Sequence, residues 1–343
     1  MKKKLNVLVI GVSGNVSIGI LKVLKDSNLG DLYTYGACIN KYSAGFGLSD
    51  EALICPLAFS NEFPAWLSRI ENELKIDLVI SGVSEVNHSL SRIKKQQNCA
   101  VYLCPEFDYL KIFNDKLETV NWLNTHRIEH PKTLDLGKPY QTQYIIEHLG
   151  LPFIIKPKIG KSSQGVRIIN NEHDLHCLDN KNGYIAQQII GTPETEFTCG
   201  VYKSRFGYTR IIVLRRELSN GTTRMAEVVS NEEIEQYCAR IAECIDTTAP
   251  FNIQLRLCEK TQMPYCFEIN MRLSGTTSIR HNFGFKDCEA WIREQIFNLD
   301  SRDLFNVVPG IAIRYEEEHF FSKHSLDKVN EIKPVRLSKS GVK

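Results

Sequence analysis

The stretch that decides the fold is FNIQLRLCEKTQMPYCFEINMRL, residues 251–273. Two β-prone runs flank a polar turn, and this pattern predicts an antiparallel hairpin. Pairing about the centre of the turn places Gln254 opposite Glu268 and Asn252 opposite Asn270. Because side chains alternate between the two faces of a strand, Gln254, Glu268 and Asn270 are expected to project from one face.

Three oxygen-bearing side chains on one strand face form a candidate Mg²⁺ site. Hard Mg²⁺ prefers carboxylate and carbonyl oxygens and usually keeps nucleotide phosphates and water as its other ligands. The alternative is a strand with a solvated polar face, and the hairpin taken alone favours that alternative. The metal hypothesis therefore depends on the segments that precede the hairpin.

Upstream, a lysine and a glycine-rich loop form a candidate phosphate site. Lys156 ends the apolar run PFIIKP, and Pro157 closes the strand, so the ammonium lies at a strand end where it can reach phosphate oxygens. The loop GKSSQG, residues 160–165, follows, and its backbone N–H groups can fold over a polyphosphate. Lys116 in FNDKLETV is, without this context, a surface helix lysine.

The first hundred residues alternate strand and helix patterns. The strand-like runs are KLNVLVI, LYTYGACI, ALICPL, DLVISG and AVYLCP, with helices expected at about residues 17–25 and 64–74. Such alternation predicts a parallel α/β sheet whose functional edge lies at the carboxyl ends of the strands. The loops after Ile10, Ile39 and Ile80 should then face one cleft.

From Phe113 onward the pattern changes to α+β. A helix, a strand and the glycine loop are followed by several antiparallel strands, a helix from about residue 231 to 245, and the hairpin. The polar, basic tail from about Ser322 is expected to be a frayed terminus.

Composition describes an ordinary globular protein of two or three modules. The 343 residues are 43% hydrophobic and 24% charged, with a formal net charge of +2, so nucleic acid is not the expected partner. The N-terminal apolar run, Leu5 to Ile10, is too short for a signal sequence or a membrane span. Eleven cysteines without a C-x-x-C pair indicate reduced thiols and a cytoplasmic location, with no membrane partner.

Taken together, these segments resemble the ATP-grasp superfamily, most closely its carbamoyl-phosphate synthetase-like and biotin carboxylase-like members. The motifs NDK, FIIKP, GKSSQG, AQQIIGTPETEFTCGV, NIQLRL and FEINMR occur in the family order and cover nearly the whole chain. The resemblance implies a parallel-sheet pre-ATP-grasp domain at residues 1–112 followed by a two-lobed ATP-grasp domain. Its small lobe with the phosphate loop would span residues 113–190, and its large lobe with the metal site and the C-terminal tail residues 191–343.

The resemblance also implies which residues bind ATP. Residues 187–190 take the place of the hinge that contacts adenine, and Gln188 stands where the family usually has glutamate. The ribose carboxylate maps onto Glu196, with Glu194 as the alternative. The implied ATP-binding residues are Lys116, Lys156, Gly160, Ser162, Ser163, Gly165, Gln188, Ile190 and Glu196.

For the chemistry, the resemblance implies that Gln254, Glu268 and Asn270 hold Mg²⁺, for which Mn²⁺ can substitute. Arg272 and Lys156 would be catalytic, because Arg272 matches the family arginine that binds the transferred phosphoryl group. Glu85 and residues 274–281 are candidates for the cleft lining. Arg215 and Arg224 are either anchors for an acidic substrate or the γ-phosphate, or simple strand-edge charges.

The activity implied is that of an ATP-dependent ligase forming C–N bonds. A substrate carboxylate would attack the γ-phosphorus to give an acyl phosphate, and an amine would displace phosphate to leave an amide, ADP and phosphate. The partners would be a small carboxylate and a small amine, and a homodimer is possible. The alternatives are phosphoryl transfer or carboxylation without amide formation, or a non-catalytic nucleotide-binding regulatory module.

The N-terminal glycine loop allows a second interpretation. Residues 11–19, GVSGNVSIG, follow a strand and open a helix, but their glycine spacing departs from the G-x-G-x-x-G fingerprint of dinucleotide-binding proteins. The resemblance instead places this helix N-terminus on the substrate side, where the backbone N–H groups of Gly14 and Asn15 can hold an anion such as a carboxylate.

Overall fold

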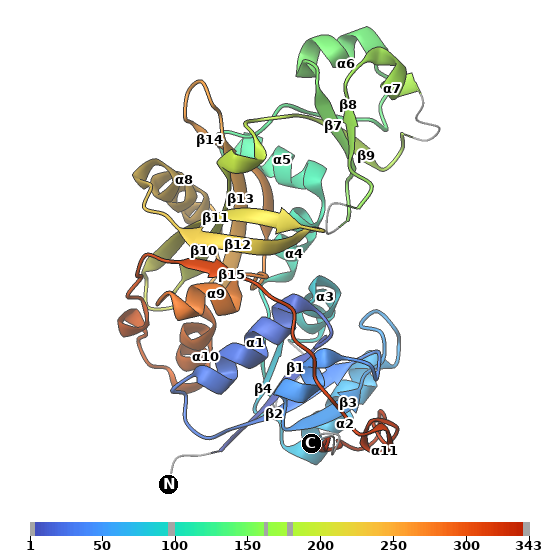
Figure 1. Cartoon of the computed structure of the whole chain (residues 1–343), viewed down its shortest axis with the longest axis vertical. Helices are drawn as coiled ribbons and strands as arrows, with labels where there is room; N and C mark the ends of the chain where they lie inside the picture. The colour runs from blue at the N-terminus through green and yellow to red at the C-terminus, as the bar shows by residue number, and fades with distance from the viewer. Residues whose placement is uncertain (1–3, 95–99, 161–163, 177–180, 339–343) are drawn as a thin grey trace.

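Three β-sheets and the helices that cover them make up the molecule (Figure 1). The structure, a computed structural model, describes residues 4–94, 100–160, 164–176 and 181–338. The parallel sheet and its helices lie at one end of the molecule, the six-stranded sheet lies in the middle, and the four-stranded sheet stands apart at the other end.

The N-terminal sheet is parallel, with the strand order β3-β2-β1-β4-β5, as the alternating pattern predicted. Its central strand is buried on both faces, because Val7 and Val9 enter one hydrophobic core and Leu8 and Ile10 enter another. This explains the uninterrupted apolar run. The strands are β1 (Leu5–Ile10), β2 (Leu32–Cys38), β3 (Glu51–Ile54), β4 (Leu78–Ser81) and β5 (Val101–Leu103), with helices α1 (Asn15–Asp26), η1 (Ala44–Leu48), α2 (Phe63–Leu74) and α3 (Ser84–Ile93) between them.

The carboxyl ends of β1 and β4 define the functional edge of this sheet. The chain reverses its order across the sheet at this point, so the loops after the two strands diverge and leave a crevice. The helices α1 and α3 begin there and direct their N-termini toward the rest of the molecule.

The six-stranded sheet is antiparallel, with the order β14-β13-β10-β11-β12-β15. Alternate residues of its central strand, Phe197, Cys199 and Val201, pack on one face against α4, α5 and α8. Part of the opposite face is covered by α9 and α10, and the rest forms the floor of the candidate site. The strands are β10 (Glu196–Lys203), β11 (Thr209–Ser219), β12 (Thr222–Val228), β13 (Pro250–Leu257), β14 (Pro264–Asn270) and β15 (Ile311–Ile313); the helices are α4 (Phe107–Asn114), α5 (Lys116–Thr125), α8 (Glu232–Glu243), α9 (Thr277–Asn282) and α10 (Asp287–Phe297).

The four-stranded sheet is also antiparallel, with the order β6-β9-β7-β8. One face packs against α6 (Thr142–Leu149) and α7 (Glu172–His176) through a small core of its own. Its strands are β6 (Thr133–Asp135), β7 (Phe153–Pro157), β8 (Arg167–Ile169) and β9 (Tyr184–Gln188). Three short helices elsewhere complete the described chain: η3 (Pro193–Thr195), η4 (Arg302–Leu304) and α11 (Lys323–Leu326).

The C-terminal tail is not a frayed end, so that expectation was wrong. The tail leaves β15 and runs back along the N-terminal sheet (Figure 1), where Val335 forms an antiparallel bridge with Ala52 on β3. Trp66 donates its indole N–H to the Glu331 carbonyl, and Arg69 donates to the carbonyls of Glu331 and Ile332. Polar composition suggested disorder, but an edge strand offers unpaired backbone groups that a polar tail can satisfy.

Helix positions agree with the sequence patterns to within two residues at each end. The helices expected at 17–25, 64–74 and 231–245 are observed at Asn15–Asp26, Phe63–Leu74 and Glu232–Glu243. Among the described residues, no helix combines the length and the apolar character that crossing a membrane requires.

Candidate active site

The predicted hairpin register is confirmed. Gln254 pairs with Glu268 and Asn252 with Asn270, and a register irregularity follows Gln254. Strand β10 extends the pattern on the other side of β13, because Thr198 pairs with Gln254 and Glu196 with Arg256. Polar side chains from adjacent strands therefore lie in rows across one face of the sheet.

Hydrogen bonds connect the candidate metal ligands to two arginines, Arg272 and Arg216. The Asn270 Nδ2 donates to Glu268 Oε1 at 2.8 Å, and Arg272 Nη2 donates to Asn270 Oδ1 at 3.1 Å. Gln254 Oε1 accepts a hydrogen bond from Arg216 Nη2 at 2.8 Å. One carboxylate and two carboxamide oxygens are the hard donors that Mg²⁺ prefers, so this donor set suits the ion.

Lys156 reaches this face from the four-stranded sheet. It is the penultimate residue of β7, is 5% exposed, and its Nζ lies 5.6 Å from the centre of the Phe267 ring on β14. Burial lowers the pKa of Lys156 to about 8, although the Glu268 carboxylate acts in the opposite direction and favours the charged form. The two sheets thus bring a buried ammonium and the Glu268 carboxylate together.

Lys116 lies beside the glycine-rich loop. It is the first residue of α5, whose N-terminus is capped by the Asp115 carboxylate. Its Nζ donates to the Gly160 carbonyl at 3.0 Å, and its backbone N–H donates to the Lys158 carbonyl at 2.9 Å. Lys116 lowers the pKa of Lys156 by charge repulsion, so two cations flank the start of the loop.

The described part of the loop shows why it carries glycine. Gly165 has φ +74°, and a Cβ there would come within 2.9 Å of the Pro157 ring. Only glycine adopts this conformation without strain. Ser162 and Ser163, which the sequence predicts as nucleotide contacts, lie outside the described residues.

The segment between β9 and β10 joins the two sheets of the candidate site. Gln188 ends β9, where its backbone N–H donates to the Lys132 carbonyl, and Ile190 follows in the connection. Gly191 has φ +55°, and a Cβ at this position would lie 2.3 Å from the Leu257 carbonyl oxygen. The hinge therefore passes very close to the end of β13.

Glu196 lies buried between two arginines that sequence reasoning missed. Arg216 on β11 donates to Oε1 through Nε and Nη2, at 3.2 and 2.8 Å, and Arg256 on β13 donates to Oε2 through Nε and Nη2, at 3.0 and 2.8 Å. Arg256 could have been found from the sequence, because it follows Gln254 by two residues on the same strand face. Arg216 carries no motif, although β10 and β11 are consecutive strands that pair as a hairpin with Phe197 opposite Arg215.

The structure places the other two candidate arginines in exposed ion pairs. Arg215 pairs with Glu227, and Arg224 pairs with Glu217; the arginine side chains are 50% and 54% exposed, respectively. Of the two interpretations left open, these contacts favour strand-edge charges. Glu194, the alternative ribose carboxylate, is exposed in η3.

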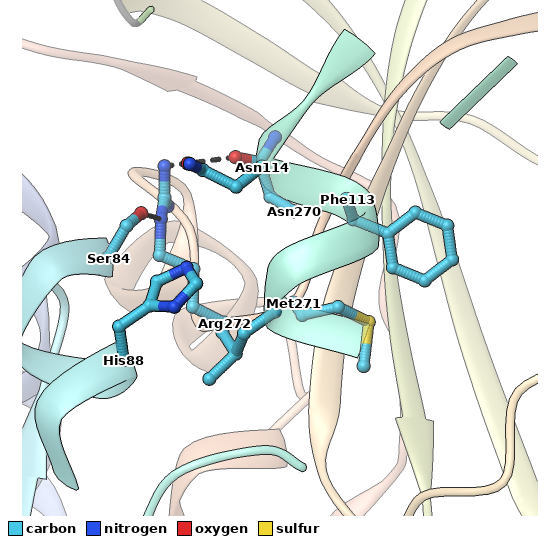
Figure 2. Close-up of a pocket in the computed structure, with 8 residues that line it drawn as sticks. Ser84, His88, Phe113, Asn114, Asn270, Met271 and Arg272 are labelled. Atoms are coloured by element: carbon cyan, nitrogen blue, oxygen red, sulfur yellow. Dashed lines mark hydrogen bonds between the residues drawn. The ribbon is translucent and has the colours of Figure 1, made fainter. Parts of the chain in front are cut away.

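Arg272 follows Glu268 and Asn270 along the chain and lies next to the N-terminal domain (Figure 2). Its Nε donates to Ser84 Oγ at 3.1 Å and its Nη1 to the Leu273 carbonyl at 2.9 Å. Burial lowers the pKa of Arg272, and the carboxylates of Glu268 and Glu85 oppose that shift. A small pocket of about 30 Å³ beside the guanidinium is lined by Ser84, His88, Leu110, Phe113, Asn114, Asn270, Met271 and Arg272.

The segment after Arg272 returns to the N-terminus of α1. A Cβ on Gly275 would meet the Asn15 side chain at 3.0 Å, and the N-cap of α1, Gly14, has no capping side chain. Arg280 is fully buried and ion-paired with Asp287, which fixes the segment in place. The candidate cleft is thus closed at this end by residues 274–281 and the first turn of α1.

Comparisons with known proteins agree with this architecture. A model of the family described as "ATP-grasp in the biosynthetic pathway with Ter operon" matches residues 192–318. The D-alanine–D-alanine ligase of Bacteroides fragilis is 27% identical over 139 residues, which are 40% of this chain and 39% of that enzyme. That of Azobacteroides pseudotrichonymphae is 33% identical over 93 residues, covering 25% of this chain and 28% of that enzyme. The matches therefore span less than half the length of these relatives.

Solved structures match over most of the chain. The N5-carboxyaminoimidazole ribonucleotide synthetase of Thermus thermophilus gives a TM-score of 0.72 at 15% identity, covering 90% of this chain and 82% of that one. The biotin carboxylase domain of the Hydrogenobacter thermophilus 2-oxoglutarate carboxylase, solved with MgADP and bicarbonate, gives 0.68 at 14% identity, covering 89% and 73%.

Two facing sheets that enclose lysines, a carboxylate and an arginine define the class of ATP-grasp proteins, and the chain has that fold. More particularly, residues 192–318 match a model of an ATP-grasp family, and the relatives that match part of the chain include D-alanine–D-alanine ligases. The superfamily predicted from the motifs is confirmed.

Proposed function

We propose that the chain is an ATP-dependent ligase that activates a carboxylate as an acyl phosphate and joins it to an amine. The observation that carries the proposal is the position of buried Lys156, whose Nζ on one sheet lies 5.6 Å from the ring of Phe267, the neighbour of Glu268, on the other. A buried ammonium beside a carboxylate and an arginine suits the binding and transfer of a phosphoryl group, which requires positioning and neutralisation of charge.

Different residues along the cleft would bind the adenine, the phosphates, the metal ion and the transferred phosphoryl group. Residues 187–190 would contact the adenine, and Lys116 and Lys156 would bind phosphate oxygens where the glycine loop, residues 160–165, folds over them. Mg²⁺ would be held by oxygens of the row Gln254, Glu268 and Asn270, and when bound it would neutralise charge on the phosphates. Arg272, at the end of the row next to the N-terminal domain, would bind the transferred group.

The substrate carboxylate would approach from the N-terminal domain, past Ser84 and the first turn of α1. Its oxygen attacks the γ-phosphorus, the bond to ADP breaks, and the acyl phosphate forms beside Arg272. Closure of residues 160–165 would exclude water from this intermediate. The amine then attacks the acyl carbon, phosphate leaves, and the amine loses a proton to give the amide.

Assay of ADP release tests the proposal directly. Mg²⁺-ATP is supplied with pooled carboxylates, with and without pooled amines, and the active pool is analysed by mass spectrometry. A ligase gives a signal that requires both pools. Glu268→Gln is expected to abolish product formation, whereas Glu217→Gln, in an exposed ion pair on β11, serves as the matched control; unaltered turnover in Glu268→Gln would remove the metal assignment.

A second candidate function is activation without amide formation. It is favoured by the structural match to a biotin carboxylase domain solved with bicarbonate. An ATPase that a carboxylate alone stimulates, with no further increase from any amine, would identify it. A non-catalytic nucleotide-binding module would bind ATP without turnover in any pool.

We also propose the domain division at residues 1–112, 113–190 and 191–343, a cytoplasmic location and small-molecule partners. A homodimer remains a prediction, which sedimentation of the purified chain can test.

A further inference from the structure

Arg314 follows the edge strand β15 and lies on the face of the six-stranded sheet that carries the candidate site. Ala226 pairs with Arg216 on one side and with Ala312 on the other, so these three residues share one face. Arg314 is two residues beyond Ala312, and its backbone N–H donates to the Arg224 carbonyl at 2.8 Å, which continues the pairing with β12. Because side chains alternate along a strand, Arg314 projects from the same face as Arg216.

The Arg314 side chain reaches the end of the cleft that the N-terminal domain closes. Its Nη2 donates to the Gly275 carbonyl oxygen at 2.6 Å. A Cβ on Gly275 would lie 3.0 Å from Nδ2 of Asn15, the first residue of α1. Covalent geometry within Gly275 then keeps the guanidinium within about 10 Å of the Asn15 carboxamide. A carboxylate that is hydrogen-bonded on both sides spans about 8 Å, so one carboxylate can lie between the two side chains.

The Arg314 guanidinium has no carboxylate partner among the residues that the structure describes. Within that part of the chain, its side-chain N–H groups have one acceptor, the Gly275 carbonyl, although a guanidinium has five N–H donors. The first turn of α1, on the other side of Gly275, contains no acidic residue. Burial lowers the pKa of Arg314, and no carboxylate opposes that shift, whereas two carboxylates oppose it at Arg272. The charge of Arg314 is therefore uncompensated.

An anionic ligand can supply the missing partner. An ionised group that is half-buried costs free energy unless an opposite charge or hydrogen bonds compensate it. The other arginines considered as anchors for an acidic substrate, Arg215 and Arg224, already pair with carboxylates in exposed positions. Arg314 instead faces the first turn of α1, which is the side from which the substrate would approach.

We propose that Arg314 binds a carboxylate of the substrate at this end of the cleft, with the Asn15 carboxamide as a second donor. The guanidinium would use its remaining N–H groups in the paired geometry that arginine offers to a carboxylate. This inference rests on the proposed function and adds a specificity-determining residue to it. Binding of the carboxylate substrate depends on Arg314, and binding of ATP does not.

Equilibrium dialysis tests the inference without turnover. The purified full chain is saturated with adenylyl imidodiphosphate and Mg²⁺ and dialysed against the pooled carboxylates, and mass spectrometry identifies and quantifies the carboxylates that the protein binds. Arg314→Gln removes the charge and keeps a side-chain amide that can donate to the Gly275 carbonyl. Arg224→Gln removes the same charge from an exposed pair with Glu217 and is the matched control.

The original chain and Arg224→Gln are expected to bind the same carboxylate equally well, and Arg314→Gln to bind it at least about tenfold more weakly. Affinity for adenylyl imidodiphosphate should stay within about twofold in both variants, which also shows that they fold. Equal affinity of all three proteins for the carboxylate, or binding of no carboxylate by the original chain, would overturn the proposal. A loss of about tenfold in affinity for the nucleotide analogue in Arg314→Gln would also overturn it, because Arg314 would then bind ATP.

The ligase activity is tested separately from this binding. A carboxylate that binds the original chain and not Arg314→Gln, but gives no ADP release with any amine, would contradict the proposed ligase and leave this inference standing. Where ADP is released, Arg314→Gln should raise the KM for the carboxylate at least about tenfold and leave the KM for ATP unchanged, and Arg314→Lys should recover part of the loss. A KM for the carboxylate that Arg314→Gln does not change would refute the role of Arg314.

Discussion

Replacing Lys156 by methionine is expected to stabilise the protein and at the same time to destroy ATP binding. Methionine has a similar length and no charge, so it removes the ammonium and keeps most of the packing. Burial lowers the pKa of Lys156 from 10.5 to about 8, even with Glu268 favouring the charged form. A pKa difference of this size corresponds to about 3 kcal/mol by which the folded protein disfavours the charge.

The lowered pKa of Lys156 determines how the stability of the protein depends on pH. Because the folded pKa lies below the unfolded one, the unfolded chain binds more protons between about pH 8 and 10.5. Stability of the original chain therefore rises with pH across this window, and below pH 8 the penalty is present in full. Lys156→Met should be more stable by up to about 3 kcal/mol at pH 7, and this advantage should shrink above pH 8.

Urea unfolding at pH 7 and pH 10, followed by fluorescence and circular dichroism, measures the difference, and calorimetric titration with ATP measures the loss of binding. Lys25→Met, on the exposed side of α1, is the control and should change neither quantity. The reasoning fails if Lys156→Met is less stable than the original chain at pH 7, or if the stability difference is the same at both pH values.

Three other perturbations probe the hinge, the buried ion pair and the tail. Gly191→Ala places a Cβ 2.3 Å from the Leu257 carbonyl oxygen at a residue with φ +55°. The substitution should lower the free energy of unfolding by more than about 1 kcal/mol and weaken ATP binding, as measured by urea unfolding and by titration with ATP. Unchanged values would contradict a strained hinge. Arg280→Met leaves the buried Asp287 carboxylate without its cation and should cost about 3–5 kcal/mol in the same unfolding assay, with Arg302→Met at the exposed pair as control. Removing residues 323–343 exposes the β3 edge and should increase proteolysis of the N-terminal domain, and equal cleavage rates would argue against a stabilising tail.

Local patterns predicted the parts of the fold in which the neighbours in sequence are also the neighbours in space. The hairpin register at Gln254–Glu268 and Asn252–Asn270 followed from the turn between the two strands, because a hairpin connection fixes which residues oppose each other. The parallel sheet followed from alternating strand and helix patterns. Neither prediction required knowledge of any distant segment.

The candidate site needed more than local patterns. Lys116, Lys156 and Arg272 were singled out by their resemblance to family motifs, and the structure brings Lys156 of one sheet close to Phe267, the neighbour of Glu268, on another. Arg216, in contrast, carried no motif and was missed, although it contacts both Glu196 and Gln254. The tail beyond Ser322 was judged from composition alone, and composition does not reveal an unpaired edge strand elsewhere.

The sequence by itself therefore determined the strands, their alternation of faces and the hairpin that carries Glu268 and Asn270, because these follow from backbone geometry over a few residues. The tertiary structure alone decided which distant segments meet: Lys156 with Phe267 beside Glu268, Arg256 with Glu196, and the tail with β3. The physical reason is that burial and charge pairing depend on the order of strands within each sheet and on the packing of one sheet against another, which periodicity along the chain does not encode.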